Sequence, residues 1–521
     1  MTSSILKYRN KIYILVLLTF SIIINQYYGN RGTFPMDSFH FFDSGYRILN
    51  GSIPFVDYWL IKGPLLDYMS AIFFYLFGVN WQAYVFQASL INAILTLSTF
   101  FILKNFKLNI NFCFFYSLLL SVLAYPSSGT PFIDHHSAFI SLLAVYCFFF
   151  AINTQKNFYW ILMPILFGFA FLSKQVPAGY LIIFIFLVTI FYVVKNKKLS
   201  VIKNCLLGTL IFISLFLVFC KTQGILISAF FDQYIFYPQT VGKERFVDYN
   251  FTFSGIVEHF IFIYLAIFFL VYVNLKKLFN EKNYTKKNDF YSFLTLTCLT
   301  FSLILHQILT KNQTFIFFLI PILSAFSHIS LNLSNLKFKK AITFFIIIIC
   351  LFSTFKYHLR FNENRKFHEL IGANFELVIN ANKIDNRLAG LKWITPQFKN
   401  DPKKEIDLIN KIKLILKSDN RSKMIITNYP FFSVILDQDV FAPSRIYTGD
   451  GTTHPIKGNK YVSKYQELMD NLIKRNEISV IYVINTANEN NNFHYIDLYK
   501  NCYEKFSLMQ QLTSYELKNC I

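Results

Sequence analysis

The sequence predicts an α-helical polytopic membrane protein with about 11 transmembrane helices, followed by a C-terminal extracytoplasmic α/β domain. Hydrophobic residues make up 54% of the 521 residues and charged residues only 15%, whereas soluble domains carry about 25% charge. The apolar residues gather into runs near the roughly 20 residues that a spanning helix needs, and basic clusters separate these runs. From about residue 356 the composition becomes polar, which indicates a separate domain.

Each apolar run before residue 356 is a candidate spanning helix. The first run lacks a small-residue cleavage site after it, so it predicts an uncleaved anchor and not a signal peptide. The runs cover residues 12–28, 81–103, 109–124, 135–151, 158–172, 177–194, 203–220, 256–274, 290–309, 314–331 and 340–355. We therefore expect a transmembrane domain over residues 1–355, with a first outer loop at 29–80.

The basic residues between the runs predict a cytoplasmic N-terminus. With this orientation, eighteen Lys and Arg residues face the cytoplasm and eight face outward, in agreement with the positive-inside rule. An odd number of spans then places residues 356–521 outside. The formal net charge of +21 follows from this loop bias, so we expect no nucleic-acid partner.

The C-terminal segment, residues 356–521, shows the alternation of an α/β domain. Helical patterns at Asp401–Lys417 and Tyr461–Arg475 alternate with β-like runs at Met424–Thr427 and Ile478–Ile484. Cys502 and Cys520 lie in this segment and are able to pair if it is extracytoplasmic, but the sequence does not decide whether they do.

The first outer loop contains the most distinctive motif of the chain. Residues 38–50 have a helical period with aromatic side chains on one face, which predicts a helix on the membrane surface. Asp37 stands at its start, where a carboxylate is able to cap free backbone N–H groups. Gly51 follows fourteen residues after Asp37, and the segments Pro-Phe-Val-Asp-Tyr-Trp (54–59) and Lys-Gly-Pro-Leu (62–65) come next.

This loop resembles the first extracytoplasmic loop of the GT-C superfamily of membrane glycosyltransferases. The resemblance covers about thirty residues and is strongest to the family-39-like group, the protein O-mannosyltransferase and lipid A aminoarabinose transferase type. Many relatives have Asp-Glu where this chain has Asp37-Ser38, so a role for the second acid does not carry over. The resemblance implies a GT-C fold, a multi-pass protein of the bacterial inner membrane and a polyprenyl-phosphate-linked sugar donor.

The same resemblance implies that Asp37 is the catalytic base. A hydroxyl or amine of an extracytoplasmic acceptor attacks the anomeric carbon while polyprenyl phosphate leaves, and a carboxylate suits the role of proton acceptor. One base opposite one leaving group implies inversion. The alternative for Asp37 is the helix cap described above.

Asp134 in the segment Pro131–His136 is the second predicted catalytic residue, because related enzymes place an acid in this loop. Buried polar groups in an apolar chain are costly unless they are used. Asp134 and His135 are also candidate ligands of a divalent metal, which would neutralise the leaving phosphate. The alternative is that one histidine hydrogen-bonds Asp134 and the other meets lipid head groups.

Five outward cations are predicted to bind the substrate: Lys62, Lys174, Lys243, Arg245 and Lys311. Relatives often have a lysine at the turn that holds Lys174, near the lipid phosphate, and cations suit an anionic leaving group. For Lys174, Lys243, Arg245 and Lys311 the alternative is an anchor at the membrane interface.

Two other functions fit a membrane protein of this kind. A lipid-linked glycan ligase or polymerase uses similar carriers, but its usual large mid-chain outer loop is missing. A transporter predicts paired half-chain repeats and ionisable residues near mid-bilayer, whereas the acids here stand at the ends of the apolar runs. The chain has no phosphate-binding or nucleophile-elbow motif.

Overall fold

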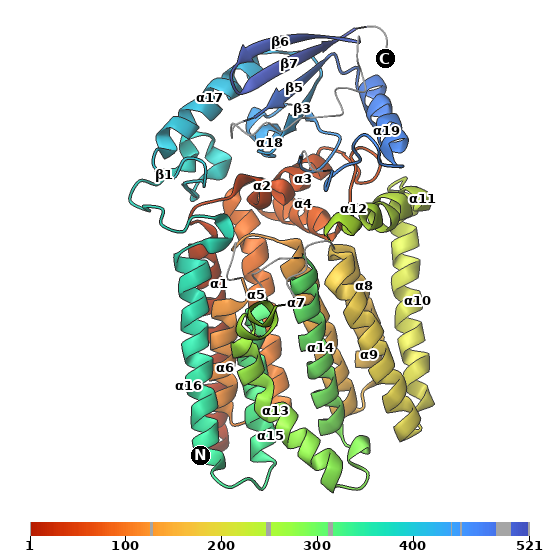
Figure 1. The fold of residues 1–521 in the computed structure, drawn as a ribbon, viewed down its shortest axis with the longest axis vertical. Helices are drawn as coiled ribbons and strands as arrows, with labels where there is room; N and C mark the ends of the chain where they lie inside the picture. The colour runs from red at the N-terminus through yellow and green to blue at the C-terminus, as the bar shows by residue number, and fades with distance from the viewer. Residues whose placement is uncertain are drawn as a thin grey trace.

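The computed structural model describes residues 2–125, 129–245, 252–310, 316–438, 440–448, 451–485 and 502–518, with side chains from residue 8 onward except 242–245 and 310. Three layers follow one another along the longest axis (Figure 1). A helical bundle forms one end, a small α/β domain forms the other, and the first outer loop lies between them. The N-terminus lies at the far end of the bundle from the α/β domain.

Eight helices of the described residues are long and apolar enough to cross a membrane. They are α1 (Thr2–Gly29), α5 (Trp81–Asn105), α7 (Ile133–Thr154), α9 (Gln175–Asn196), α10 (Leu199–Thr222), α13 (Ile261–Asn280), α14 (Asn288–Thr310) and α16 (Lys339–His358). Four shorter apolar helices are α4 (Leu65–Phe77), α6 (Ile110–Leu123), α8 (Asn157–Ser173) and α15 (Leu319–Asn332). Each predicted apolar run overlaps one of these helices, and the predicted fold class is confirmed.

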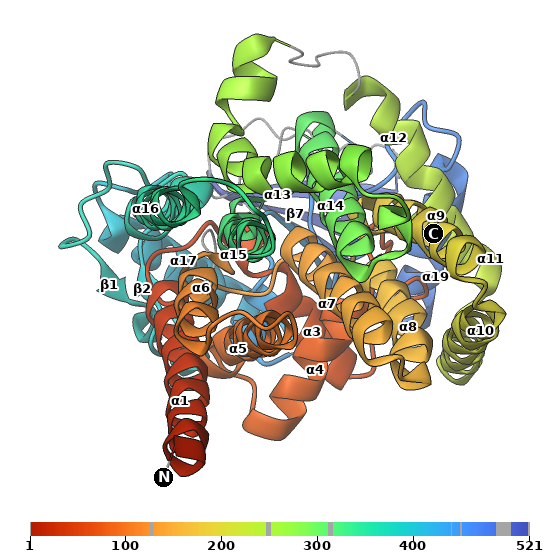
Figure 2. The same cartoon turned by 90° about the horizontal axis from the view of Figure 1, so that it is seen from below.

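The bundle has a protein-packed centre and a lipid-facing rim. Helix α7 lies at the centre of the bundle, and 78% of its most apolar stretch of 18 residues is buried inside the protein. For α10 the buried share of such a stretch is only 11%. Figure 2 shows α10 at the edge of the bundle, on the opposite side from α1. Since hydrocarbon solvates apolar side chains, the exposed leucines of α10 suit a position against lipid.

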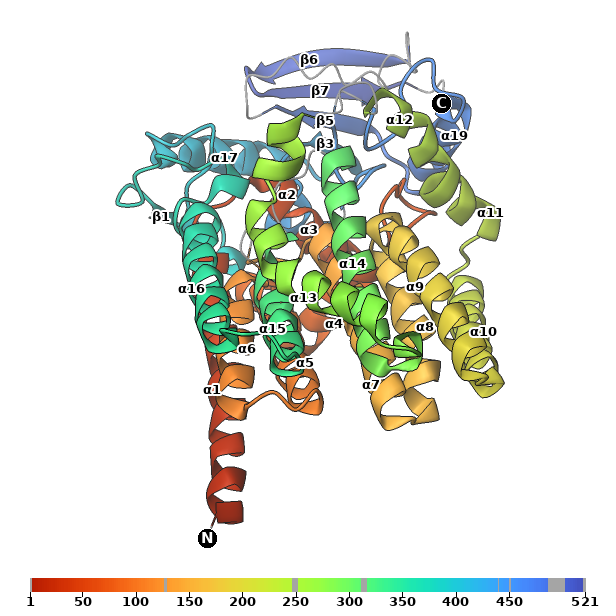
Figure 3. The same ribbon diagram turned by 60° about the horizontal axis from the view of Figure 1, so that its bottom comes forward.

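The α/β domain contains a five-stranded sheet in the order β4-β3-β5-β7-β6. The parallel part comprises β3 (Lys423–Thr427), β4 (Val440–Phe441) and β5 (Val480–Ile484), and the antiparallel part comprises β6 (Tyr503–Met509) and β7 (Leu512–Leu517). The domain also contains α17 (Pro402–Ser418), α18 (Phe432–Leu436) and α19 (Val462–Arg475), and a separate pair of β1 (Ile379–Asn380) with β2 (Lys392–Trp393). Figure 3 shows β6 farthest from the bundle. The two predicted helices and two predicted β-like runs correspond to α17, α19, β3 and β5.

The middle layer differs from the predicted surface helix. The segment breaks at Phe39 into α2 (Pro35–Ser38) and α3 (His40–Leu49), and α3 is buried from His40 to Gly45. Its aromatic face contacts protein and not lipid head groups. The ring centroid of Phe39 lies 5.0 Å from that of Trp81 in the bundle and 4.7 Å from that of Phe431 in the α/β domain. The α/β domain covers the helix, which the pattern of the loop alone does not reveal.

The carboxyl ends of β3 and β4 hold the first outer loop. After β3, the Ser433 hydroxyl donates a hydrogen bond to Asp43. After β4, the carbonyl of Ala442 accepts a hydrogen bond from Arg47 at 3.2 Å, and that of Pro443 accepts one from the backbone N–H of Trp59 at 2.8 Å. The loop is thus fixed between the bundle and the sheet.

Gly63 sets how closely the loop approaches the bundle. Its backbone N–H donates to the carbonyl of Ser173 at 3.2 Å, and a Cβ atom at this position would lie 1.6 Å from the carbonyl oxygen of Leu172. Only glycine fits, because the obstructing atom belongs to the backbone. The approach places Lys62 beside the turn that carries Lys174.

We therefore expect Gly63→Ala to destabilise the protein by about 1–3 kcal/mol, the usual cost of overpacking a well-packed site. The measurement is the apparent melting temperature of the purified protein in detergent. Gly179→Ala in α9 is the matched control, since a Cβ atom added at Gly179 would have no other atom within 4 Å. Equal melting temperatures for the two variants would contradict the role of Gly63.

Candidate active site

Asp37 lies in the short helix α2, at the boundary between the bundle and the α/β domain. Its backbone N–H donates to the carbonyl of Phe34 at 3.0 Å. The N-cap positions of α2 and α3 are Phe34 and Phe39, and neither residue makes a side-chain capping bond. The described contacts therefore do not support a helix-capping role for the Asp37 carboxylate.

The surroundings of Asp37 suit a proton acceptor. Burial raises the pKa of the Asp37 carboxyl to about 6, the nearby positive charge of Lys62 opposes this rise, and Asp134 and Glu369 add to it. The carboxyl is thus mostly ionised at neutral pH but takes up a proton more readily than an ordinary aspartate. A pKa close to the working pH is what an efficient general base needs.

Asp134 stands in the first turn of α7 and is joined to two other helices. It forms an ion pair with Lys174, which lies between α8 and α9. It also accepts a hydrogen bond from Nε2 of His306 in α14 at 3.1 Å. The side chains of Asp134 and His306 are almost fully buried. This cluster fixes three helices relative to one another at the end of the bundle that faces the α/β domain.

Lys62 is close enough to Asp37 and Asp134 for their charges to act on its ammonium. Burial lowers the pKa of the Lys62 ammonium to about 8, and the positive charge of Lys174 lowers it further. The negative charges of Asp37 and Asp134 act in the opposite direction. In the described part of the chain, Lys62 has no carboxylate within the 4.0 Å of an ion pair, so its charge remains available to a ligand.

The ammonium of Lys174 forms an ion pair with Asp134. Its predicted role at the lipid phosphate remains a prediction. Lys243 and Arg245 belong to α12 (Tyr237–Arg245), but their side chains lie outside the described residues, as does all of Lys311. Their predicted substrate-binding roles remain predictions.

The arrangement does not fit the predicted metal site at Asp134 and His135. Among the described residues, no group of three or more His, Cys, Asp and Glu side chains is placed to hold a metal ion. Lys174 and His306 both contact Oδ1 of Asp134. The His135 ring instead lies among aromatic rings, 5.8 Å from Tyr125 and 5.7 Å from Phe139 between centroids.

Three residues near the site are not apparent as functional candidates from the sequence. His306 stands near the end of an apolar run, and its partner Asp134 is 172 residues away in sequence. No sequence pattern marks Glu369 or Arg445 as a site residue, because both lie in the C-terminal segment, far along the chain from the loop that they approach. Their charges act on Asp37 and Lys62 respectively.

Comparisons with known proteins agree with this architecture. Residues 61–220 match the family model described as dolichyl-phosphate-mannose-protein mannosyltransferase. No curated protein sequence matches the chain. Among solved structures, the chain resembles the crystal structure of ArnT from Cupriavidus metallidurans bound to undecaprenyl phosphate, with a TM-score of 0.50 and 11% identity, covering 96% of this chain and 97% of that one.

The structure of the same ArnT in the apo state gives a TM-score of 0.48 at 11% identity, covering 97% of this chain and 98% of that one. The similarity to ArnT extends over almost all of both chains, so it includes the α/β domain as well as the bundle. At this identity it concerns the fold. Together with the family match over residues 61–220, it shows that this protein is a multi-pass membrane protein with the GT-C fold of membrane glycosyltransferases.

Proposed function

We propose that the protein is an inverting glycosyltransferase that moves a sugar from a polyprenyl-phosphate carrier to an extracytoplasmic acceptor. The observation that carries this proposal is that the carboxylate of Asp37 lies near the ammonium of Lys62 at the end of an apolar bundle. Lys62 forms no ion pair within 4.0 Å among the described residues. The fold shared with a protein that binds undecaprenyl phosphate supports a lipid-linked donor.

The residues divide the chemistry between them. The acceptor hydroxyl or amine attacks the anomeric carbon and gives its proton to Asp37. The bond from that carbon to the phosphate oxygen breaks, and the electron pair leaves with the polyprenyl phosphate. Lys62 stabilises the negative charge that develops on the phosphate. A single displacement inverts the anomeric centre.

Asp134 is proposed as a positioning residue. Its negative charge acts on Lys62 and on Asp37, while its own carboxylate is held by Lys174 and His306. We therefore expect Asp134 to act through Lys62 and Asp37 and not directly on the substrates. A metal is not required by this scheme, and no step is assigned to one.

The transporter alternative is less well supported by the geometry. The charged cluster of Asp134, Lys174 and His306 lies at the outer ends of α7, α8 and α14. A transporter is expected to place its ionisable groups near the bilayer midplane. The position of the cluster instead suits chemistry at the membrane surface.

We propose that the α/β domain is extracytoplasmic and the N-terminus cytoplasmic. The first outer loop and the α/β domain lie at one end of the bundle and the N-terminus lies at the other (Figure 1). The excess of Lys and Arg in the predicted cytoplasmic loops gives the direction. Cys502 is disulfide-bonded, and such bonds persist in oxidising compartments.

Orientation is tested by cysteine labelling in intact cells with a membrane-impermeant maleimide. The exposed side chain of Lys457 lies in the α/β domain, and that of Lys337 lies between α15 and α16 at the other end of the bundle. Lys457→Cys should be labelled in intact cells, and Lys337→Cys only after permeabilisation. The reverse pattern would overturn the orientation.

Asp37→Asn should lower the rate of sugar transfer by roughly 10²–10⁴-fold, the usual worth of general base catalysis. The amide keeps the shape of the side chain but cannot take up the proton, so folding and donor binding should persist. The measurement is turnover of purified protein with a polyprenyl-phosphate sugar, together with donor affinity.

Glu369→Gln is the matched control for Asp37→Asn, because Glu369 is an exposed carboxylate whose charge acts on Asp37. It should keep near-normal turnover at neutral pH. Asp43→Asn is unsuitable as a control, since Asp43 is buried against Arg47 and Ser433. Normal turnover in Asp37→Asn, or an equal loss in Glu369→Gln, would exclude Asp37 as the base.

The pH dependence of kcat/KM should be bell-shaped. The rate should rise as Asp37 ionises through pH about 6 and fall as Lys62 loses its proton through pH about 8. In Lys62→Arg the alkaline limb should move to higher pH, because a guanidinium stays protonated. In Glu369→Gln the acidic limb should move to lower pH, because one of the charges that raise the pKa of Asp37 is removed. Unmoved limbs in both variants would contradict the assignment.

A further inference from the structure

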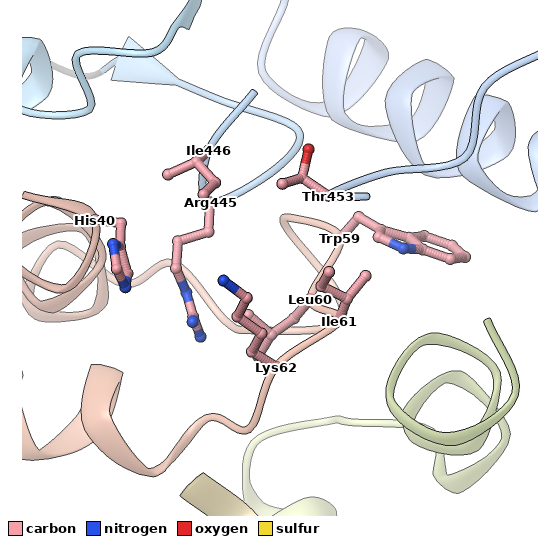
Figure 4. Close-up of a pocket in the computed structure, with 8 residues that line it drawn as sticks. All are labelled: His40, Trp59, Leu60, Ile61, Lys62, Arg445, Ile446 and Thr453. Atoms are coloured by element: carbon pink, nitrogen blue, oxygen red, sulfur yellow. The ribbon is translucent and has the colours of Figure 1, made fainter. Parts of the chain in front are cut away.

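Cations gather at both ends of the helical bundle. Figure 4 shows Arg445 extending from the α/β domain and Lys62 from the first outer loop toward the same cavity, which belongs to the candidate active site. The second group lies at the opposite end of the bundle, in the turns after α13 and after α15 (Figure 1). Its lysines are Lys276, Lys277, Lys282, Lys286, Lys287, Lys337, Lys339 and Lys340. Within residues 276–289 and 333–340 the only acids are Glu281 and Asp289, so this end carries a strong positive charge.

A groove lies within this charged surface, between the end of α13 and the turn that joins α15 to α16. It holds about 560 Å³ of space between atoms, including the part that is open to solvent. The floor of the groove is apolar, because the buried side chain of Val273 packs there with Leu331 and Ile346, and Leu336 lies against them. The end of α13 forms one wall and the turn forms the other.

The protein neutralises the cations of the groove only in part. Lys276 lines the groove and has no carboxylate within the 4.0 Å of an ion pair among the described residues. Lys277 lines it as well and lies 3.9 Å from Asp289, near the limit of that distance. The carboxylate of Glu281 also lines the groove, but Lys287 binds it at 2.7 Å. The groove therefore keeps an excess of positive charge and suits an anionic group.

Two amide side chains add hydrogen-bonding groups that carry no charge. Asn280 belongs to the α13 wall and Asn335 to the wall formed by the turn, and both are exposed. An amide supplies two N–H donors and a carbonyl acceptor. Hydroxyl groups donate and accept hydrogen bonds, so the pair of amides suits a ligand that carries hydroxyls beside its negative charge.

Apolar side chains on the outside of α13 lead up to the groove. One stripe of this helix, in which each residue follows the last by three or four positions, is fully exposed: Phe268, Tyr272, Leu275 and Phe279. On the far side of the groove, Leu333 is 55% and Phe338 82% exposed. Apolar surface of this extent is unfavourable in water and favourable against acyl chains. A small free anion would use the cations alone, whereas a lipid would use both the cations and the apolar stripe.

We propose that this groove binds the headgroup of an anionic phospholipid from the surrounding bilayer. The phosphate lies against Lys276 and Lys277, the headgroup hydroxyls lie against Asn280 and Asn335, and the acyl chains follow the apolar stripe of α13. Basic pockets between transmembrane helices are a known way of recognising lipid headgroups. The site is at the other end of the bundle from the candidate active site, so it does not depend on the proposed function.

The test is native mass spectrometry of the purified full-length protein, titrated with phosphatidylglycerol or with phosphatidylcholine. Both lipids contain a phosphate, but only phosphatidylglycerol has a net negative charge and free hydroxyls. The wild type should bind the first phosphatidylglycerol more tightly than the first phosphatidylcholine. Lys276→Gln should weaken the binding of phosphatidylglycerol about fivefold, the usual worth of one lysine beside an anionic lipid, and should leave phosphatidylcholine binding unchanged.

Lys282→Gln is the matched control for Lys276→Gln, because Lys282 is an exposed lysine at the same end of the bundle that does not line the groove. Asn335→Asp is a second variant, which adds a negative charge inside the groove. Its control is Asn283→Asp, which adds the same charge at an exposed position outside the groove. Each groove variant should bind phosphatidylglycerol more weakly than its control. Equal affinities in a groove variant and its control, or equal affinities of the wild type for the two lipids, would overturn the proposal.

Discussion

Charge burial at the end of the bundle that faces the α/β domain constrains the whole structure. Three carboxylates there are removed from water, and each is matched by a partner from elsewhere in the chain: Asp134 by Lys174 and His306, Asp67 by Arg445, and Asp43 by Arg47 and Ser433. Removing one partner of such a buried pair costs about 3–5 kcal/mol. Asp37 and Lys62 differ, because neither has an ion-pair partner within 4.0 Å among the described residues. The paired residues stabilise the fold, whereas Asp37 and Lys62 remain available to bind the substrates.

The α/β domain is integrated with this scaffold through one edge of its sheet. In α/β sheets of this kind the carboxyl ends of parallel strands are the usual ligand-binding edge. Here the segments that follow β3 and β4 contact the first outer loop, at Asp43, Arg47 and Trp59. This edge of the sheet therefore contacts a loop of the same chain. The side chain of Arg445, which follows β4, extends from this edge toward Lys62. A domain that composition alone describes as a separate unit is in fact one wall of the candidate site.

Local patterns in the sequence predict the helices and strands, but they do not predict which charged residues contact one another. Long apolar runs and alternating segments predict the bundle and the α/β domain. The loop motif predicts Asp37 and Lys62 as site residues, and the segment Pro131–His136 predicts Asp134. The ion pair of Asp134 with Lys174 and the burial of α3 depend on contacts between distant segments, such as Arg445 with Asp67, 378 residues apart. The metal hypothesis does not match the geometry either, because among the described residues no group of three or more His, Cys, Asp and Glu side chains is placed to hold a metal ion.

The junction between the loop and the sheet also sets the order in which the site can be completed during synthesis. The loop at residues 29–80 leaves the ribosome early, but Ser433 and Arg445, which cover its carboxylates, follow only near the end of the chain. Until then Asp43 and Asp67 lack these partners and α3 lacks its cover. A chain that stopped before β3 would lack Ser433 and Arg445 and would leave the carboxylates of Asp43 and Asp67 without these partners.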